Sequence, residues 1–410
     1  MLRKNLLTIA LFLTSLCFAN GQSLESYLQK GLKNSPLLKE YNIQTLSGTL
    51  DSLLVKAAYK PQIHQVSQAM YAPASKNFGY DEAITNGGNY SALVNLIQPL
   101  FTKKLKESQF RDISLANQTT AINARITEND LKQGITAQYL TVYASFLQIQ
   151  FSQNTINLLK EQQSGVKSLV NKGIYLQTDL MNISLAVTTQ EVAVKQANIQ
   201  FKNNLAILNF ICGISDTSNI VLEKPDITIR NSFDISSSPV MIKFTIDSLK
   251  NVNSKLAIDL NYKPKLSAFA DAGFMAVTPE NIPHNFGTSF GINFTIPIYD
   301  GQQRKLQYDK ASLAENSRSN YKAFYTTQYK QQINQLTEQL KLTDDLISGI
   351  RSQLAEQEKL IELYKIEIEK GLVRFLDFLN VVNNYTATKN SLTVSEMNRL
   401  QIINQMNYLK

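Results

Sequence analysis

The sequence has few of the residues that build catalytic or metal-binding sites. Among 410 residues there are two histidines and two cysteines, and neither His64 nor His284 lies in a pattern with metal-ligand spacing. The chain also lacks a glycine-rich phosphate loop, a pair of carboxylates in one apolar site, and a nucleophile beside a base. These absences argue against an enzyme, and no cofactor or metal is expected.

The two cysteines do not indicate a disulfide framework. Cys17 is preceded by Leu16, where a lipid-attachment motif has a small residue, so lipid anchoring is disfavoured. Cys212, in the stretch NFICGI, has no partner. We expect it to be a small buried hydrophobic residue.

Long hydrophobic runs and concentrated basic patches are also missing. Charged residues make up 18% of the chain and hydrophobic residues 43%. Beyond the N-terminus no apolar run approaches the roughly 20 residues of a membrane helix. The net charge is +8, but the basic residues are mixed with acidic ones rather than clustered with aromatics, so nucleic acid is not an expected partner.

The first 21 residues have the pattern of a secretion signal. Arg3 and Lys4 precede an apolar stretch from Leu6 to Phe18 that is too short to span a membrane. Ala19 and Gly21 are small residues at the positions that a signal peptidase inspects. We predict a signal peptide over residues 1–21, and a retained anchor helix is the less favoured alternative.

Proline is absent from two long stretches of the chain. None of the ten prolines lies between residues 100 and 224 or after residue 297. Because proline interrupts helices, both stretches are predicted to be helical, and each follows a strand-like zone flanked by prolines. The run from Thr102 to Lys172, if helical throughout, would be roughly 100 Å long.

The two halves of the chain match each other. YKPQI at residues 59–63 matches YKPKL at 262–266, and NKGIYLQTDLMN at 171–182 matches EKGLVRFLDFLN at 369–380. The second match has an offset of 371 − 173 = 198 residues, which the pair Phe101 and Tyr299 shares. We predict an internal duplication with one structural repeat over 22–219 and a second over 220–410. Each repeat is expected to contain a helix, a strand pair, and two long helices joined by a sharp tip turn, near 173 and near 371.

Strands are predicted at about 61–72, 88–98, 264–277 and 286–298. The last, FGTSFGINFTIPIY, alternates apolar residues on one face with small and polar residues on the other. This pattern is typical of an outer-membrane strand that faces lipid on one side and a lumen on the other. A half-buried strand of a soluble sandwich is the alternative, but four strands beside long helices leave no second sheet to pack against.

Four strands are too few to close a barrel, and lipid does not tolerate an open sheet edge. The chain is therefore expected to share a transmembrane barrel with copies of itself. Two copies would supply eight strands, which side chains fill. Three copies would supply twelve strands and leave a channel, so a homotrimer is favoured.

The helical stretches carry apolar residues in steps of three and four, which indicates left-handed coiled-coil seams. One seam begins at Leu176 and continues to Ile211, and another runs from Ile333 to Ile368. The predicted fold class is thus mainly α with membrane β: a long coiled-coil α-helical barrel joined to the shared transmembrane β-barrel.

With these features the chain resembles the outer-membrane efflux proteins typified by TolC. The resemblance covers nearly all of the mature sequence and is most specific at the tips, where the family has a glycine, an aspartate six residues later, and then an apolar residue. Gly173 with Asp179 matches this pattern, and so does Gly371 with Asp377. A family member works as a trimeric channel-tunnel for efflux or type I secretion, located in the outer membrane with its helices in the periplasm.

The resemblance also implies partners and residue roles. Gly173, Ile174, Gly371 and Leu372 would form the tips that meet a periplasmic adaptor, which an inner-membrane pump accompanies. Thr178, Asp179, Arg374, Asp377 and Asn380 would lie near the periplasmic entrance, where carboxylate rings favour cations. The alternative is that Asp179 and Asp377 cap the helices that follow, and both roles can hold at once.

Two features depart from the family pattern. Ile368 and Val373 stand where a tyrosine and an arginine hold the entrance shut in the best-known member, and Asn380 replaces a second aspartate. The competing hypothesis is a coiled-coil surface or structural protein of the cell envelope without a pore. The sequence does not identify the exported substrate.

Overall fold

The computed structural model describes residues 22–73, 78–79, 87–215, 221–230 and 233–409. The predicted signal peptide lies outside the described residues. The chain divides into two compact units, and each draws on both halves of the sequence. The hairpin unit comprises the described residues up to Lys39, Arg125–Ile235 and Thr326 onward, and the sheet unit comprises Glu40–Ala124 and Ser236–Tyr325.

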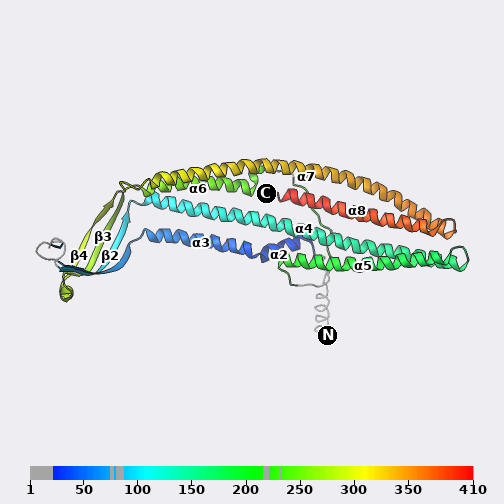
Figure 1. The fold of residues 1–410 in the computed structure, drawn as a ribbon, viewed down its shortest axis with the longest axis horizontal. Coiled ribbons are helices and arrows are strands. Elements are labelled where there is room, and N and C mark those ends of the chain that lie inside the picture. The colour runs from blue at the N-terminus through cyan, green and yellow to red at the C-terminus, as the bar shows by residue number, and fades with distance from the viewer. Residues whose placement is uncertain (1–21, 74–77, 80–86, 216–220, 231–232, 410) are drawn as a thin grey trace, which may run out of the picture. The chain divides into compact units, whose positions relative to one another are not determined.

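The described elements follow the order that the sequence predicts, a mainly helical chain with two strand pairs (Figure 1). In chain order they are α2 (Leu24–Asn34), α3 (Pro36–Ala58), β1 (Gln62–Ala72), β2 (Gly87–Leu100), α4 (Lys103–Asn171), α5 (Gln177–Cys212), η1 (Ile235–Ser237), α6 (Pro239–Asn261), β3 (Lys265–Ala276), η2 (Pro279–His284), β4 (Phe286–Thr295), α7 (Gln303–Glu369) and α8 (Phe375–Asn407). The predicted fold class is confirmed. Within the described residues, no helix contains a stretch long and apolar enough to cross a membrane.

The structure differs from the sequence expectation at two boundaries. The first helix is divided into α2 and α3 at Ser35, because Pro36 has no N–H to donate to the preceding turn. The last strand ends at Thr295 rather than at 298, just before Pro297, which cannot donate a ladder hydrogen bond.

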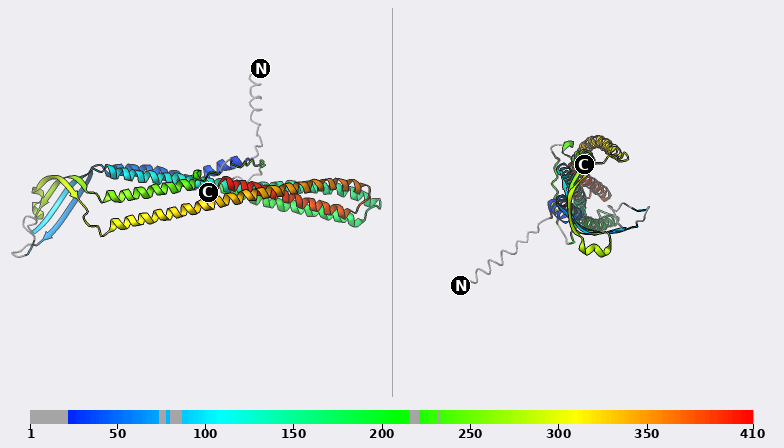
Figure 2. Two further views of the ribbon diagram at one scale, coloured as in Figure 1. Left: turned by 90° about the horizontal axis from the view of Figure 1, so that it is seen from above. Right: turned by 90° about the vertical axis from the view of Figure 1, so that its left-hand side faces the viewer.

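The four strands form one antiparallel sheet in the order β1-β2-β3-β4, side by side in Figures 1 and 2. Its register brings polar residues of neighbouring strands together: Asn95 pairs with Asp271, which in turn pairs with Ser289. Ser289 donates a hydrogen bond of 2.7 Å to the Asp271 carboxylate. The polar alternation of single strands thus gives one face that carries polar rows, interrupted by the pair Ile97 and Phe269.

The opposite face of the sheet is apolar and uncovered. Ala270 pairs with Phe290, and Phe290 is 90% exposed. Ile63, Ile292 and Phe294 are exposed as well. In the part of the chain that the structure describes, β1 and β4 each pair along one edge only. The sheet therefore has an exposed apolar face, a polar face and two open edges.

The hairpin unit has two main hydrophobic clusters. One lies near the turns that join α4 to α5 and α7 to α8, and both halves of the chain contribute to it: Leu159, Val166, Leu169, Ile183, Val187, Ile361, Ile368, Phe375, Phe378, Leu379 and Val382. The other surrounds Tyr139, whose hydroxyl donates to the carbonyls of Gln22 (3.0 Å) and Glu223 (2.7 Å). Cys212 is buried in this cluster, as expected, and burial raises the pKa of its thiol to about 11.

The buried positions of α7 confirm the predicted seam. Ile347, Leu354, Ile361 and Ile368 follow one another at intervals of seven and are all buried, which is the spacing of one coiled-coil position. In the other seam the first predicted residue does not take part. Leu176 is 70% exposed because it is the N-cap of α5 rather than a residue within the helix.

In the sheet unit, α6 is tied to α7 by a carboxylate. Glu315 accepts hydrogen bonds from Arg318 (2.6 Å), Asn251 (2.9 Å) and Ser248 (3.4 Å). The Arg318 guanidinium, followed by the Asn251 amide, lowers the pKa of Glu315 to about 2.

Candidate functional site

The turn between α4 and α5 is a Schellman motif. The N–H of Ile174 donates to the Leu169 carbonyl (3.0 Å), and the N–H of Gly173 donates to the Val170 carbonyl (2.9 Å). Gly173 has a φ of 73°, which glycine adopts without steric cost. The sequence places this glycine correctly at the reversal.

The turn between α7 and α8 repeats this backbone. Leu372 donates to the Glu367 carbonyl (3.0 Å), Gly371 donates to the Ile368 carbonyl (2.9 Å), and the φ of Gly371 is 70°. The two turns lie at the same end of the hairpin unit (Figure 1). We call them the first tip (residues 173–179) and the second tip (residues 371–377).

The two tips contact each other, which the sequence did not predict. The Tyr175 hydroxyl donates a 2.7 Å hydrogen bond to the carbonyl of Val373, its own counterpart at the repeat offset of 198. Burial, and secondarily the charge of Asp179, raises the pKa of Tyr175. A Cβ on Gly371 would lie only 2.5 Å from Cγ2 of Ile174. The second tip therefore needs glycine for space as well as for conformation.

Asp179 caps α5. Its carboxylate accepts a 3.0 Å hydrogen bond from the N–H of Leu176, the residue before the helix begins. A carboxylate at this third helical position satisfies an N–H that has no helical partner and lies close to the positive end of the helix dipole. The capping alternative for Asp179 thus has direct geometric support.

Asp377 occupies the matching position but has a different partner. Its carboxylate contacts the Arg374 guanidinium at 3.2 Å and 3.4 Å, and the Arg374 side chain is 83% exposed. Such an exposed pair contributes little to stability, but it offsets the negative charge of Asp377. Both residues were expected at the entrance, but their pairing was not predicted.

The remaining predicted site residues are on the surface. Ile174 and Leu372 are 51% and 71% exposed, so each tip presents an uncovered apolar side chain. Leu176 and Leu376 add two more. Thr178 and Asn380 are exposed polar residues in the first turn of α5 and the second turn of α8. Together the tips form a surface of exposed apolar side chains beside charged ones.

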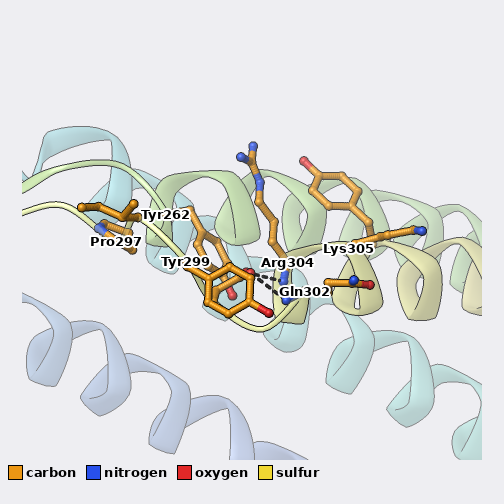
Figure 3. Close-up of a pocket in the computed structure, with 9 residues that line it drawn as sticks. Tyr262, Pro297, Tyr299, Gln302, Arg304 and Lys305 are labelled. Carbon is orange, nitrogen blue, oxygen red and sulfur yellow. Dashed lines mark hydrogen bonds between the residues drawn. The ribbon is translucent and has the colours of Figure 1, made fainter.

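A second polar cluster lies where β4 leads into α7 (Figure 3). Asp300 accepts hydrogen bonds from the backbone N–H groups of Arg304 (2.8 Å) and Gln302 (2.9 Å), and these bonds lower its pKa. Arg304 also contacts Asp259 on α6 at 2.6 Å. The hydrogen bond from Tyr308, and then that from Arg304, lowers the pKa of Asp259. A cavity of about 570 Å³ adjoins this cluster, but its charged groups mostly satisfy one another.

The described residues contain no group of three or more His, Cys, Asp or Glu side chains that could hold a metal ion. No protein-family model matches the chain, and no curated protein matches it. The evidence from comparison is therefore structural.

The fold is that of outer-membrane channels of known structure. The open-state MtrE outer membrane channel of Neisseria gonorrhoeae superposes with a TM-score of 0.72 at 11% identity, covering 94% of this chain and 88% of that one. The outer membrane protein VceC of Vibrio cholerae gives 0.72 at 11% identity, covering 93% and 94%. The CmeC outer membrane channel of Campylobacter jejuni gives 0.69 at 13% identity, covering 95% and 86%. At the level of fold, the resemblance expected from the sequence is confirmed.

Proposed function

We propose that the protein is the outer-membrane channel-tunnel of a tripartite efflux or type I secretion system. It would be a passive conduit from the periplasm, or from an inner-membrane pump, to the exterior, without enzymatic activity. The solved structures that share its fold are described as outer membrane channels or proteins. The helices would extend into the periplasm.

The main support for the proposal is the character of the two faces and the two edges of the sheet. Its apolar face is exposed, its opposite face carries polar rows such as Asn95, Asp271 and Ser289, and its two edge strands have no outer partner among the described residues. An apolar sheet face suits lipid, but an unpaired backbone edge in lipid costs several kcal/mol per group. Joining β4 of one copy to β1 of the next removes both edges.

Three copies would give a barrel of 3 × 4 = 12 strands, with the polar face toward an aqueous lumen. The apolar face, including Phe290 and Ile292, would contact outer-membrane lipid. A homotrimer is therefore the proposed assembly.

The two tips are proposed as the region that meets the periplasmic adaptor. Gly173 and Gly371 set the turns, and the exposed Ile174 and Leu372 offer apolar contacts. Thr178, Asp179, Arg374, Asp377 and Asn380 would then line the periplasmic entrance. Because Arg374 binds Asp377, Asp179 would supply most of the uncompensated negative charge there.

The test is single-channel recording in planar bilayers with the signal-cleaved protein, combined with the mass of the detergent-solubilised particle. A trimer that gives discrete current steps supports the proposal. A particle that inserts and gives no current supports the envelope-protein alternative. A monomer that stays in solution without detergent contradicts the proposed barrel.

A further inference from the structure

At the end of the sheet nearest the helices, the last polar rows and the neighbouring apolar pair Leu100 and Leu266 border a cavity of about 520 Å³ within the sheet unit. Ser267, Asn293 and Thr295 line it from the strands. Ser267 pairs with Asn293, and Thr295 pairs with Lys265, so these residues form the last two polar rows of β3 and β4. In the proposed barrel this face borders the lumen, so the cavity would open toward the passing cargo.

The charged groups that line this cavity are all cationic. They are Lys104 in the first turn of α4, Lys263 just before β3, and Lys265 at its first position. No aspartate or glutamate lines the cavity, and among the described residues none of the three lysines forms an ion pair within 4.0 Å. The charge of Lys263 does contribute to lowering the pKa of Asp259, but Tyr308 and Arg304 are the main partners of that carboxylate.

The first turn of α4 adds a further positive potential. Thr102, Lys104 and Leu105 line the cavity, and α4 begins at Lys103. The backbone N–H groups at the start of a helix have no helical acceptor and carry the positive end of the helix dipole. The N-terminus of α4 therefore attracts anions, as the lysines do.

The rest of the wall is largely apolar. Leu100 and Phe101 contribute from the end of β2, Leu105 from α4, and Leu260 from the last turn of α6. A small inorganic anion would use the lysines but leave this surface without a partner. An organic anion with an apolar body matches both parts of the cavity.

From this arrangement we propose that the cavity is a binding subsite for amphipathic organic anions, such as aromatic sulfonates or carboxylates, within the conduit. The inference rests on the proposed function, because it takes the polar face to line the lumen. It contrasts with the entrance, where the carboxylate of Asp179 would favour cations. With this subsite, the channel itself would favour amphipathic anions as cargo.

The experiment measures block of single-channel current by 1-naphthalenesulfonate in the reconstituted full-length mature protein. The matched probes are 1-naphthylmethylammonium, which reverses the charge, and methanesulfonate, which lacks the apolar body. We expect the naphthalenesulfonate to block at the lowest concentration, and raising the salt to weaken that block because charge attraction is screened.

The variant to test replaces all three lysines: Lys104→Gln, Lys263→Gln and Lys265→Gln. Each lysine is exposed, so its contribution is modest, and together they should weaken the sulfonate block about tenfold. The matched control removes the same charge elsewhere through Lys56→Gln, Lys310→Gln and Lys330→Gln. The sulfonate should block this control as strongly as it blocks the unmodified protein. Lys263→Glu should shift the preference toward the ammonium probe.

Equilibrium dialysis of the same probes against detergent-solubilised protein measures binding without any current. If the protein conducts and binds the three probes equally, or if the triple variant and its control behave alike, the subsite is ruled out. If no current is seen but dialysis shows the sulfonate preference and its loss in the triple variant, the subsite stands and the proposed channel function fails.

Discussion

The turn between α4 and α5 and the turn between α7 and α8 have the same backbone but different side-chain partners. Both are Schellman motifs whose glycines have φ values of 73° and 70°. In the first tip, Asp179 binds a backbone N–H, whereas in the second tip Asp377 binds the side chain of Arg374. A duplicated chain can thus keep its reversal while the charge presented there changes.

The two tips also differ in what they bury. Phe375 and Phe378, at the start of α8, are fully buried. Their counterparts at the offset of 198 are Gln177, which is exposed, and Leu180, which is half-buried. The start of α8 therefore supplies the fully buried aromatic side chains of the shared cluster, whereas the start of α5 does not.

The largest effect is expected from truncating that aromatic core. Phe378→Ala should destabilise the hairpin unit by about 3–5 kcal/mol because a fully buried ring is removed, and Leu180→Ala should cost clearly less. Hydrogen exchange of amides near the tips would measure both. Equal losses of protection would show that the two tips share the core evenly.

The glycines come next. Gly173→Ala and Gly371→Ala should each cost roughly 1–2 kcal/mol for placing a side chain at positive φ. Gly371→Ala should cost more, since its Cβ would meet Ile174 whereas nothing lies within 4 Å of the Cβ position at Gly173. Thermal unfolding of the two variants, compared side by side, measures the difference. A larger loss for Gly173→Ala would contradict the described contact between the tips.

The ion pair of Glu315 and Arg318, outside the tips, should make the stability of the sheet unit depend on pH and can be compared with the pair of Arg374 and Asp377. Glu315 and Arg318 have the i, i+3 spacing of Arg374 and Asp377, but Arg318 is far less exposed than Arg374. The pKa of Glu315 is lowered from 4.5 to about 2, so its stabilising effect is present above pH 4.5 and is lost as the pH falls toward 2. Urea unfolding of the sheet unit across this range should show the loss, and Glu315→Gln should reduce the pH dependence. An unchanged slope in that variant would contradict the assignment.

Replacing each of the two aspartates should change stability by a different amount, because the aspartates have different partners. Asp179→Ala removes a cap and should cost about 1 kcal/mol, while Asp377→Ala removes an exposed pair and should cost less than about 1 kcal/mol. Hydrogen exchange of the first turns of α5 and α8 would report each locally. If Asp377→Ala proved the more damaging, the pair with Arg374 would have to be more than a surface contact.

The smallest effect on stability is expected from removing the charge of Arg374. Arg374→Gln should leave stability nearly unchanged and free the Asp377 carboxylate, so the preference for K⁺ over Cl⁻ in reversal-potential measurements should rise. Asp377→Asn should have the opposite effect. Conductance and selectivity that stay the same in both variants would remove Asp377 from the proposed entrance.

Local patterns in the sequence were sufficient to predict much of this molecule. The alternation of Phe286 to Thr295 identifies a strand because side chains on a strand have a period of two. Gly173 and Gly371 mark reversals because few other residues accept positive φ. Both features depend on neighbours along the chain, and both were predicted close to their observed positions.

Other features depend on contacts between distant residues and left no local signal. The hydrogen bond from Tyr175 to Val373 joins residues 198 apart, and the repeat offset alone did not show that the tips touch. The lysines of the proposed anion subsite come from two separate segments, the start of α4 and the start of β3, which only the folded chain brings to one cavity. The partners of Asp179 and Asp377 are local, but residue spacing alone left open whether each carboxylate binds a backbone N–H or a side chain.

The unpaired edges of β1 and β4 have a consequence for biogenesis. A newly exported copy would expose a row of free backbone donors and acceptors on each side, which can pair with any extended peptide that it meets. Productive assembly would then compete with aggregation, and its yield would depend on how fast sister chains encounter one another before a foreign strand does. Cells would have to shield these nascent polypeptides until their companions arrive.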